Sequence, residues 1–487
     1  MNLAQNDNDR RIVFVCRNPT GEDLRNARAI GMLRDVRVLG ISEDFSGDRG
    51  RELFADLFCL RDAHDTDQLV SAARSLAAKH GRLDRIVTTT ETLLEPVARA
   101  GEILGLGGMT APAVRRVLDK SRFKRILERA GIKTARDLVL TDNKAARRFA
   151  REVGFPIVLK PPGGSGGLAT WRIRSASQLE LALELMKPSP DSAVLAEEYL
   201  RGQELCFDTI TIKDEPRFYS ICCYRPSILQ ALEEPLVQWS CVMPRDIGGD
   251  RYRGLIEQGL AAVRALSVGN AMTHMEAFLV EGAGPCFIDA TLRPAGARIG
   301  PMLGLAYDVD PYFAWARVAV DGCFDGPWDR KYAVGTVFLR GPGDGFVERV
   351  HGMDSVRHQL GRLLVQERLP RAGAARAVTY TGDGYITVRH PETLTVEDAL
   401  DFIAETVRIE YRHSDSPPLH GEATTGGWGQ RLRYFDKQLY RPAWENDTPQ
   451  LIGVMQQDWS THGNADAIPF CSEKEQGLQP SNKGRKP

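Results

Sequence analysis

Short apolar runs alternate with amphipathic stretches through the first part of the chain. The apolar runs have the length of strands, whereas the stretches between them repeat their apolar positions with the period of a helix. Strands that alternate with helices of this length are typical of an α/β fold built on a doubly wound parallel sheet. The predicted strands cover residues 11–16, 36–41, 57–60 and 84–90, and the predicted helices cover residues 22–33, 68–80 and 93–104.

The middle of the chain combines helical stretches with runs that indicate antiparallel hairpins. Residues 205–213 and 218–224 form one predicted hairpin, and residues 271–280 and 286–292 form another. Residues 225–250 lack a clean period, so we expect a long irregular loop of the kind that often lines a binding site. The other predicted strands cover residues 157–159, 169–173 and 193–199, and the predicted helices cover residues 114–130, 143–153, 179–186, 253–266 and 311–320.

The last part of the chain is predicted to hold one more α/β segment and then a flexible tail. Strands are expected over residues 333–339, near 377–380 and near 385–389, with a helix over 396–407. From residue 413 onward the chain is rich in Pro, Gly, Ser, Gln and Asn, with one piece around 428–444 that could dock. We therefore expect four units, which cover residues 1–113, 114–325, 326–413 and 414–487.

Composition and charge exclude several classes of protein. The chain of 487 residues is 43% hydrophobic and 26% charged, which is ordinary for a soluble globular protein. Its 63 basic residues balance 64 acidic ones, so no overall charge points to nucleic acid or a membrane surface. The polar N-terminus resembles no signal peptide, and the nine cysteines contain no C-x-x-C pair. Reduced thiols in the cytoplasm are therefore expected, and a catalytic cysteine lacks a supporting motif.

A glycine-rich segment is the first candidate for chemistry. Residues 157–168 read IVLKPPGGSGGL, a buried strand that ends in Lys160 and leads into a loop with four glycines. Glycine lets backbone N–H groups approach an anion, and a lysine adds a positive charge, so this hairpin loop could cradle phosphate. It is not a Walker A loop, because no G-K-[ST] ends it. An ordinary glycine-rich turn is the competing interpretation.

Two carboxylates on neighbouring strands are the second candidate. Glu276 and Asp289 lie on the two strands of one predicted hairpin, where they repel each other unless a cation lies between them. Carboxylate oxygens suit Mg²⁺ that bridges nucleotide phosphates, and Lys120 and Lys160 could neutralise the remaining phosphate charge. Taken together in chain order, these groups point to a site for a nucleoside triphosphate.

Four segments in this order resemble the ATP-grasp superfamily of carboxylate–amine ligases. They read DKSRFKRILERAGI (119–132), FPIVLKPPGGSGG (155–167), LAEEYLRGQE (195–204) and HMEAFLVEGAGPCFIDATLRPAG (274–296). The resemblance covers about residues 10–410 and is strongest over 114–325. It implies an ATP-grasp domain at the centre, preceded by a Rossmann-like pre-ATP-grasp domain.

The resemblance implies roles for the phosphate-binding residues. Lys120 and Lys160 would contact the ATP phosphates, and Lys160 would also assist catalysis. Ser165, Gly166 and Gly167 would cover the phosphates. Closure of this loop would keep water away from a reactive intermediate.

The adenosine would lie along the third of these segments. By resemblance, Glu197 would accept a hydrogen bond from the adenine amino group, and the backbone of Glu198 and Leu200 would hold the adenine edge. Tyr199 belongs to the same ATP-binding segment, and Glu204 would bind the ribose hydroxyls.

The fourth segment would supply the metal site, with Mg²⁺ or Mn²⁺ held by Glu276 and Asp289. The family usually has Glu-x-Asn where this chain has Asp289-Ala290-Thr291, so Thr291 would offer only a weak neutral ligand. Either the metal is shifted, or one of two ions is held loosely. By resemblance, Arg293 would stabilise the transferred phosphoryl group and is therefore, with Lys160, a predicted catalytic residue.

Substrate contacts are the least specific expectation. Arg293 and Gly296 would approach a substrate carboxylate, and Arg298 would help to bind it. His274 is a substrate candidate whose structural interpretation is stronger, and Glu91 and Trp239 are candidates from loops.

Three functions remain open at this point. The favoured one is ATP-dependent ligation of an amino acid or small carboxylic acid to an amine through an acyl-phosphate, because residues 335–350 and 380–391 resemble the extra lobe of the L-amino-acid ligases that make dipeptides. Bicarbonate activation, as in biotin carboxylases, and a non-catalytic ATP-binding regulator with a weakened metal site are the alternatives. The expected partners are a small carboxylate and an amine, with no nucleic acid or membrane. The resemblance also allows a homodimer, and the oligomeric state stays open.

Overall fold

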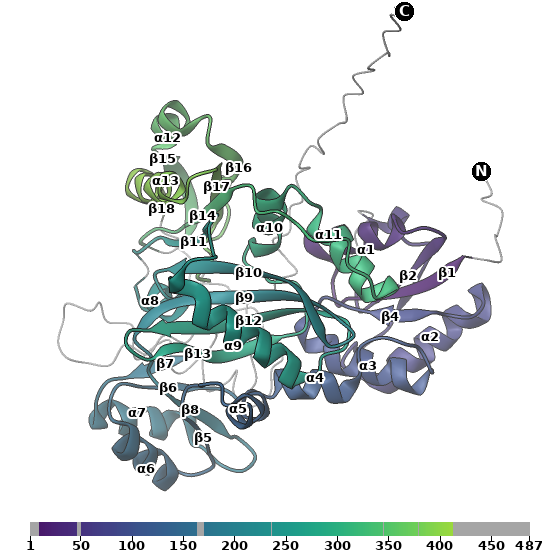
Figure 1. The fold of residues 1–487 in the computed structure, drawn as a ribbon, viewed down its shortest axis with the longest axis horizontal. Coiled ribbons are helices and arrows are strands. Elements are labelled where there is room, and N and C mark those ends of the chain that lie inside the picture. Colours follow the sequence, from purple (N-terminus) through teal and green to yellow (C-terminus); the bar gives the residue numbers. More distant parts are fainter. Residues whose placement is uncertain are drawn as a thin grey trace, which may run out of the picture.

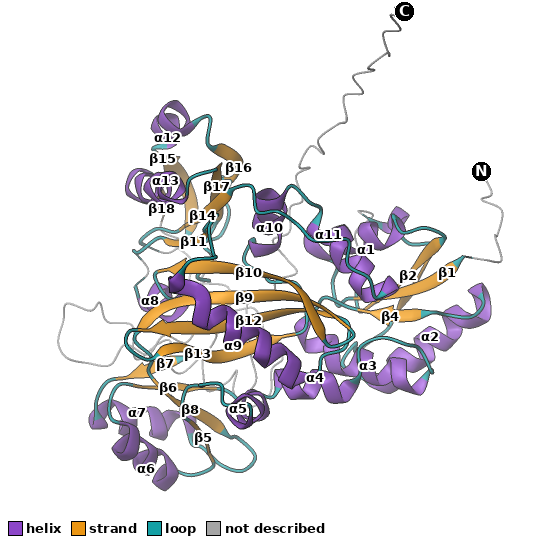
Figure 2. Cartoon of the chain, viewed as in Figure 1, coloured by secondary structure: helices purple, strands orange, loops and turns teal. Residues whose placement is uncertain are grey.

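The computed structural model describes residues 9–45, 50–162, 170–234, 236–343, 345–377 and 379–412 (Figure 1). Four β-sheets organise this part of the chain, and helices cover their faces (Figure 2). No helix in these ranges is both long and apolar enough to span a lipid bilayer. The predicted tail and the piece around residues 428–444 lie outside the described residues.

The N-terminal sheet confirms the predicted doubly wound architecture. Its strand order is β3-β2-β1-β4, and all neighbouring strands are parallel. Alternate residues of the central strand pack on opposite faces, with Val13 against α2 and α3 and Phe14 against α1. The elements are β1 (Arg10–Val15), α1 (Gly21–Gly31), β2 (Val36–Ser42), a 3₁₀ turn (Arg51–Leu53), β3 (Asp56–Cys59), α2 (Thr66–His80), β4 (Arg85–Val87), a second 3₁₀ turn (Glu91–Leu93) and α3 (Leu94–Ile103).

The single helix predicted over residues 114–130 is wrong, because the chain breaks it at Asp119. The two helices that result are α4 (Ala111–Leu118) and α5 (Lys120–Arg129). Asp119 has extended backbone angles, and its side chain accepts a hydrogen bond of 2.9 Å from the Arg122 backbone N–H. An aspartate at this position caps the second helix, which therefore starts in a new direction with Lys120 at its first residue.

A small antiparallel sheet follows, with strand order β5-β8-β6-β7. Its apolar face packs on α6 and α7, where Leu159 and Ala196 are fully buried. The opposite face carries Lys160 and Glu197, since each directly follows one of these two residues and successive side chains on a strand point to opposite faces. The elements are β5 (Asp137–Leu140), α6 (Asn143–Val153), β6 (Ile157–Lys160), β7 (Trp171–Ile173), α7 (Ala176–Met186) and β8 (Val194–Glu198).

An eight-stranded antiparallel sheet is the largest element of the structure, with the order β13-β12-β9-β10-β11-β14-β17-β16. It runs without interruption from the predicted central unit into the predicted C-terminal lobe. One face packs on α4, α5 and α9, with Phe207 and Phe287 at the centre of that core. The elements from the central unit are β9 (Gly202–Ile212), β10 (Glu215–Arg225), α8 (Ile228–Glu233), β11 (Trp239–Met243), α9 (Asp250–Leu266), β12 (Ala271–Val280) and β13 (Gly284–Thr291).

The long irregular loop expected over residues 225–250 is wrong. This segment contains α8 and β11, and β11 pairs with both β10 and β14 inside the large sheet. Trp239 is fully buried, donates from Nε1 to the Pro226 carbonyl at 3.1 Å, and packs its ring against Tyr224 and Tyr380. The helix and strand are too short to show a period, so pairing with a distant strand decides their conformation.

The C-terminal part adds the outer strands of the large sheet and a two-stranded sheet, β15-β18. The strand expected near 377–380 is absent, since the described residues 377, 379 and 380 lie in no strand. Helix α11, which precedes the outer strands in the chain, packs on α1 of the N-terminal part. The elements are α10 (Ile299–Tyr307), α11 (Pro311–Ala316), a π-helical turn (Arg317–Asp321), β14 (Ala333–Leu339), β15 (Phe346–His351), α12 (Met353–Leu360), β16 (Leu364–Arg368), β17 (Gly384–His390), α13 (Thr393–Thr406) and β18 (Arg408–Arg412).

The placement of Trp239 predicts a large difference between two neighbouring substitutions. Trp239→Ala should lower the free energy of unfolding by about 3–5 kcal/mol, because it leaves a cavity among packed rings. Leu236→Ala, at a side chain that is 68% exposed, should change it by less than about 0.5 kcal/mol. Urea unfolding of both variants measures the difference, and equal, small effects would show that Trp239 lies in a loop after all.

Candidate functional site

Buried ion pairs link helix α5 both to the small sheet and to the large one. Lys124 Nζ lies 2.5 Å from one carboxylate oxygen of Glu197, and Lys160 Nζ lies 2.6 Å from the other. Lys120 forms an ion pair with Asp289 on β13. All three lysines have less than a sixth of their side chain exposed, so their charges depend on these carboxylates rather than on water.

The pairing shifts the pKa values of both partners. Burial alone would raise the pKa of Glu197, but the charges of Lys160 and Lys124 outweigh it and lower the pKa to about 2. Burial would lower the pKa of Lys160, but the carboxylates of Glu197 and Asp289 raise it. Both groups are therefore charged near neutral pH.

Helix α5 delivers two of the three lysines to this site. Lys120 and Lys124 lie four residues apart, so they share one face of the helix. The first reaches β13 of the large sheet, whereas the second reaches β8 of the small sheet. Sequence reasoning missed Lys124, and the signal that it could have used is this spacing from Lys120 on an amphipathic helix.

The two carboxylates predicted to face each other do so. Glu276 on β12 is the register partner of Asp289 on β13. Burial and the charge of Glu276 raise the pKa of Asp289 against the opposing effect of Lys120 and Lys160. Burial and the same charge raise the pKa of Glu204, on the neighbouring strand, to about 8. Burial would raise the pKa of Glu276 itself, but neighbouring positive charges lower it. A cation bound at this edge would favour the ionised forms of Asp289 and Glu204.

The donor set at this edge suits a hard divalent cation such as Mg²⁺. Glu276 and Asp289 offer carboxylate oxygens, and Thr291 lies two residues further along β13. The Thr291 hydroxyl is buried and has no hydrogen-bond partner among the described residues. Oxygen ligands without thiolate or imidazole are what Mg²⁺ prefers, so these residues fit the metal that the sequence predicts.

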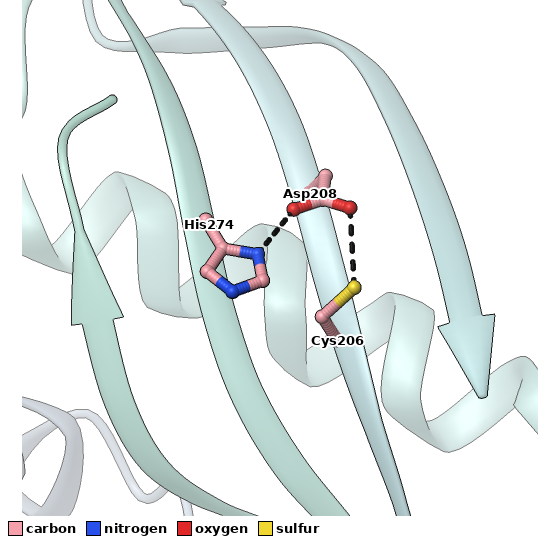
Figure 3. Close-up of side chains that lie close together, drawn as sticks. All are labelled: Cys206, Asp208 and His274. Carbon is pink, nitrogen blue, oxygen red and sulfur yellow. Dashed lines mark hydrogen bonds and ion pairs between the residues drawn. The ribbon is translucent and has the colours of Figure 1, made fainter. Parts of the chain in front are cut away.

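His274 lies beside this carboxylate pair and is already bonded within the protein. Its Nδ1 is 2.6 Å from Asp208 Oδ1, and its Nε2 is 3.8 Å from Glu276 Oε1 (Figure 3 draws the Asp208 contact). Burial would lower the pKa of His274, but the Asp208 carboxylate raises it well above its usual value. The structural interpretation of His274 agrees with these contacts better than direct contact with substrate.

Arg293 and Glu91, both predicted as substrate contacts, form an ion pair across the molecule. Arg293 follows β13, and Glu91 follows β4 of the N-terminal sheet. Arg293 Nη2 lies 2.7 Å from Glu91 Oε2, and both side chains are about one-fifth exposed. The pair therefore joins the N-terminal sheet to the carboxylate edge of the site.

The remaining substrate candidates, Arg298, Gly296 and Trp239, do not all lie together. Arg298 lies over the Tyr385 ring at 4.3 Å and donates to Gln366 of the C-terminal part. Among the residues that the structure describes, and apart from the two chain neighbours of Gly296, only the Arg293 guanidinium lies within 4 Å of the position where a Gly296 side chain would begin. Trp239 belongs to the core of the large sheet, so the expectation that it lines a pocket from a loop is corrected.

The predicted adenosine-binding residues lie at and beyond the end of β8. Glu198 pairs with Arg136 at 2.7 Å, and the Tyr199 hydroxyl accepts a hydrogen bond from Arg172 at 2.9 Å. Leu200 follows directly, and Glu204 accepts from the Ile228 backbone N–H at 2.7 Å. Ser165, Gly166 and Gly167 lie outside the described residues, between the paired strands β6 and β7.

Comparison with known proteins gives matches in sequence and in structure. Residues 119–215 match the family model described as the carbamoyl-phosphate synthase L chain, ATP binding domain. The chain is 24% identical over 245 residues to alanine–anticapsin ligase of Bacillus subtilis, which covers 47% of this chain and 52% of that protein. It is 23% identical over 252 residues to the L-arginine-specific L-amino acid ligase of Bacillus subtilis, covering 50% of this chain and 59% of that protein.

The structural match extends further than the sequence matches. The L-amino acid ligase from Bacillus licheniformis superimposes with a TM-score of 0.67 and 18% identity, covering 83% of this chain and all of that one. The chain therefore has the ATP-grasp fold, as its motifs predict. In sequence, it spans about half the length of the curated relatives that it matches.

The buried ion pairs predict unequal effects for two adjacent glutamates. Glu197→Gln should lower the free energy of unfolding by about 3–5 kcal/mol, because it removes the carboxylate that contacts both buried lysines and leaves Lys124 with Asp137 at 3.9 Å. Glu198→Gln is the matched control: its partner Arg136 is 59% exposed, so the loss should be about 0–1 kcal/mol. Urea unfolding at pH 7 measures both losses.

The same difference should depend on pH in a defined window. A carboxylate with a lowered folded-state pKa stabilises the protein above its unfolded pKa of 4.5 and loses that contribution as pH falls toward 2. The gap in stability between the wild type and Glu197→Gln should therefore be constant above about pH 5 and shrink below it. A gap that stays unchanged down to the lowest pH at which the protein remains folded would contradict the charged pairing of Glu197.

Proposed function

We propose that this chain is an ATP-dependent carboxylate–amine ligase with an amino acid as one substrate. The observation that carries the proposal is the pairing of buried lysines with the carboxylates Glu197 and Asp289 beside the register pair Glu276 and Asp289. Cations for phosphate and oxygen ligands for a divalent metal lie next to each other in one buried site. The match to an ATP-binding domain and the names of the relatives support the same reaction class.

ATP would enter this site by taking over the lysines' present partners. The phosphates carry several negative charges, so they compete with Asp289 for Lys120 and with Glu197 for Lys160. Lys124 keeps Glu197 paired when Lys160 turns to phosphate, since it contacts the other carboxylate oxygen. Glu276 and Asp289, with Thr291 nearby, would hold Mg²⁺, which would supply positive charge against the phosphate oxygens.

The reaction then needs two displacements. An oxygen of the substrate carboxylate attacks the γ-phosphorus of ATP, the bond to the β–γ bridging oxygen breaks, and ADP leaves. The product is an acyl-phosphate. The nitrogen of an amine attacks its carbonyl carbon, the bond from that carbon to the phosphate oxygen breaks, and phosphate leaves as the amide forms. The amine gives up a proton to solvent or a base.

Arg293 is the residue best placed to stabilise the transferred phosphoryl group. It lies two residues beyond Thr291, where β13 ends, and its guanidinium is paired with Glu91 of the N-terminal part. Guanidinium groups bind phosphate oxygens through paired N–H donors, which is the property this step uses. Glu91 would keep Arg293 in orientation before the substrate arrives.

The substrate class rests on Arg298 and on the relatives. Arg298 lies where the loop after β13 meets the C-terminal strands, and its Nε is buried without a partner among the described residues. A free guanidinium N–H of this kind suits a carboxylate. Two relatives are named as ligases of alanine and of L-arginine, so amino acids are the first substrates to test.

The proposal predicts phosphate release from ATP and Mg²⁺ only when certain pairs of amino acids are present. Glu276→Gln should reduce this release by about 100-fold or more, because it removes charge from the metal ligands. The matched control is Glu281→Gln, in the exposed turn of the same β12–β13 hairpin, which should retain wild-type activity. A coupled assay for free phosphate over a panel of single amino acids and pairs measures both variants.

Two other outcomes would assign a different function. Release that depends on bicarbonate and not on amino acids would favour bicarbonate activation. Tight ATP binding without phosphate release from any pair would contradict the ligase assignment and favour a regulatory module.

A further inference from the structure

Four polar side chains form a square on one face of the large sheet. Strands β9 and β12 are antiparallel neighbours, with Asp208 opposite His274 and Cys206 opposite Glu276. Residues two apart on a strand point to the same face, so all four side chains lie together. Glu276 is in turn opposite Asp289 on β13, which places this square directly beside the carboxylate pair of the site.

Asp208 contacts two of the other three side chains of the square, His274 and Cys206. Its Oδ1 lies 2.6 Å from His274 Nδ1, and its Oδ2 accepts a hydrogen bond from the Cys206 thiol at 3.2 Å. Figure 3 shows both partners turned toward this one carboxylate. Because both of its oxygens are used, Asp208 has one fixed orientation, and it fixes the plane of the imidazole ring.

The far side of the imidazole points at Glu276. When Nδ1–H donates to Asp208, the ring is held with Nε2 facing outward, and Nε2 lies 3.8 Å from Glu276 Oε1. A carboxylate that orients a histidine, which then contacts the group that binds a metal, is an arrangement that tunes metal sites. In this protein the histidine contacts a carboxylate ligand rather than the metal.

We propose that Asp208 is a positioning residue for Glu276, acting through His274, with Cys206 holding the second oxygen of Asp208. The proposal rests on the ligase function above, because it assigns the square a role in placing a metal ligand. Asp208 itself touches neither ATP nor substrate. Its removal should therefore weaken metal binding while leaving the rest of the nucleotide site intact.

A metal site within the square is the competing interpretation. The ligand atoms of Cys206, Asp208 and His274 lie within 4.8 Å of one another, and thiol, carboxylate and imidazole together suit a softer ion such as Zn²⁺. However, the thiol and Nδ1 are already bonded to Asp208, and burial raises the pKa of the Cys206 thiol well above its usual value. The contacts therefore favour a protein-internal network.

The test measures Mn²⁺ binding by electron paramagnetic resonance, with the full chain and a non-hydrolysable ATP analogue present. Asp208→Asn should weaken Mn²⁺ binding by about 10–100-fold, the usual effect of losing an outer partner of a metal ligand. Binding of the analogue without metal should stay within twofold of wild type. Thr209→Val is the matched control, since its buried hydroxyl faces the opposite side of β9 and has no partner in the described structure.

Activity provides the second readout. The Mg²⁺ concentration for half-maximal phosphate release should rise in Asp208→Asn, while kcat at saturating Mg²⁺ recovers most of its wild-type value. A fall in kcat with unchanged Mg²⁺ dependence would overturn the positioning role. If the wild type binds neither nucleotide nor Mn²⁺, the proposed function fails; if the wild type binds both and Asp208→Asn binds equally well, only the positioning role fails.

Cys206 supplies variants that do not remove a charge. Cys206→Ser keeps a donor to Asp208 and should bind Mn²⁺ nearly as wild type does, whereas Cys206→Ala should bind it several-fold more weakly. This rescue keeps the proposal testable if Asp208→Asn does not fold. Addition of Co²⁺ tests the alternative: a near-ultraviolet thiolate–cobalt band that Cys206→Ser abolishes would overturn the proposal in favour of a metal site.

Discussion

The structure depends on a set of buried lysine–carboxylate pairs between two sheets. Lys124 and Lys160 share Glu197 on the small sheet, and Lys120 pairs with Asp289 on the large one. A buried charge without a partner costs several kcal/mol, so each of these groups requires the others to be in place. The break at Asp119 serves this arrangement, because it starts α5 with Lys120 at its first turn and Lys124 one turn later.

Under the proposed function, this network would form the phosphate site. Carboxylates neutralise the charges of the lysines, and ATP would exchange for part of that negative charge. Under the proposed function, Glu276 and Asp289 would hold the divalent metal beside these phosphates.

The sequence predicts those parts of the fold that local pattern decides. The parallel sheet was predictable because its strands and helices alternate, and the facing of Glu276 and Asp289 because their strands form one hairpin. Asp208 and the strand position of Trp239 were not, since each depends on contacts between segments far apart in sequence. Lys124 was missed although its spacing from Lys120 is visible in the sequence; only its contact with Glu197 required the structure. At Asp119 the helical pattern continues through the residue, so it predicted one helix where the aspartate caps the start of a second one.

Under the proposed function, a substrate carboxylate attacks the γ-phosphorus of ATP in this site. The most direct measurement follows oxygen atoms: an amino-acid substrate with ¹⁸O in its carboxylate is incubated with the full chain, ATP, Mg²⁺ and an amine acceptor. The acyl-phosphate route predicts that one ¹⁸O passes from each carboxylate into the phosphate released, detected by mass spectrometry. Unlabelled phosphate formed together with amide product would contradict the acyl-phosphate route, because the carboxylate oxygen would then never have been bonded to phosphorus.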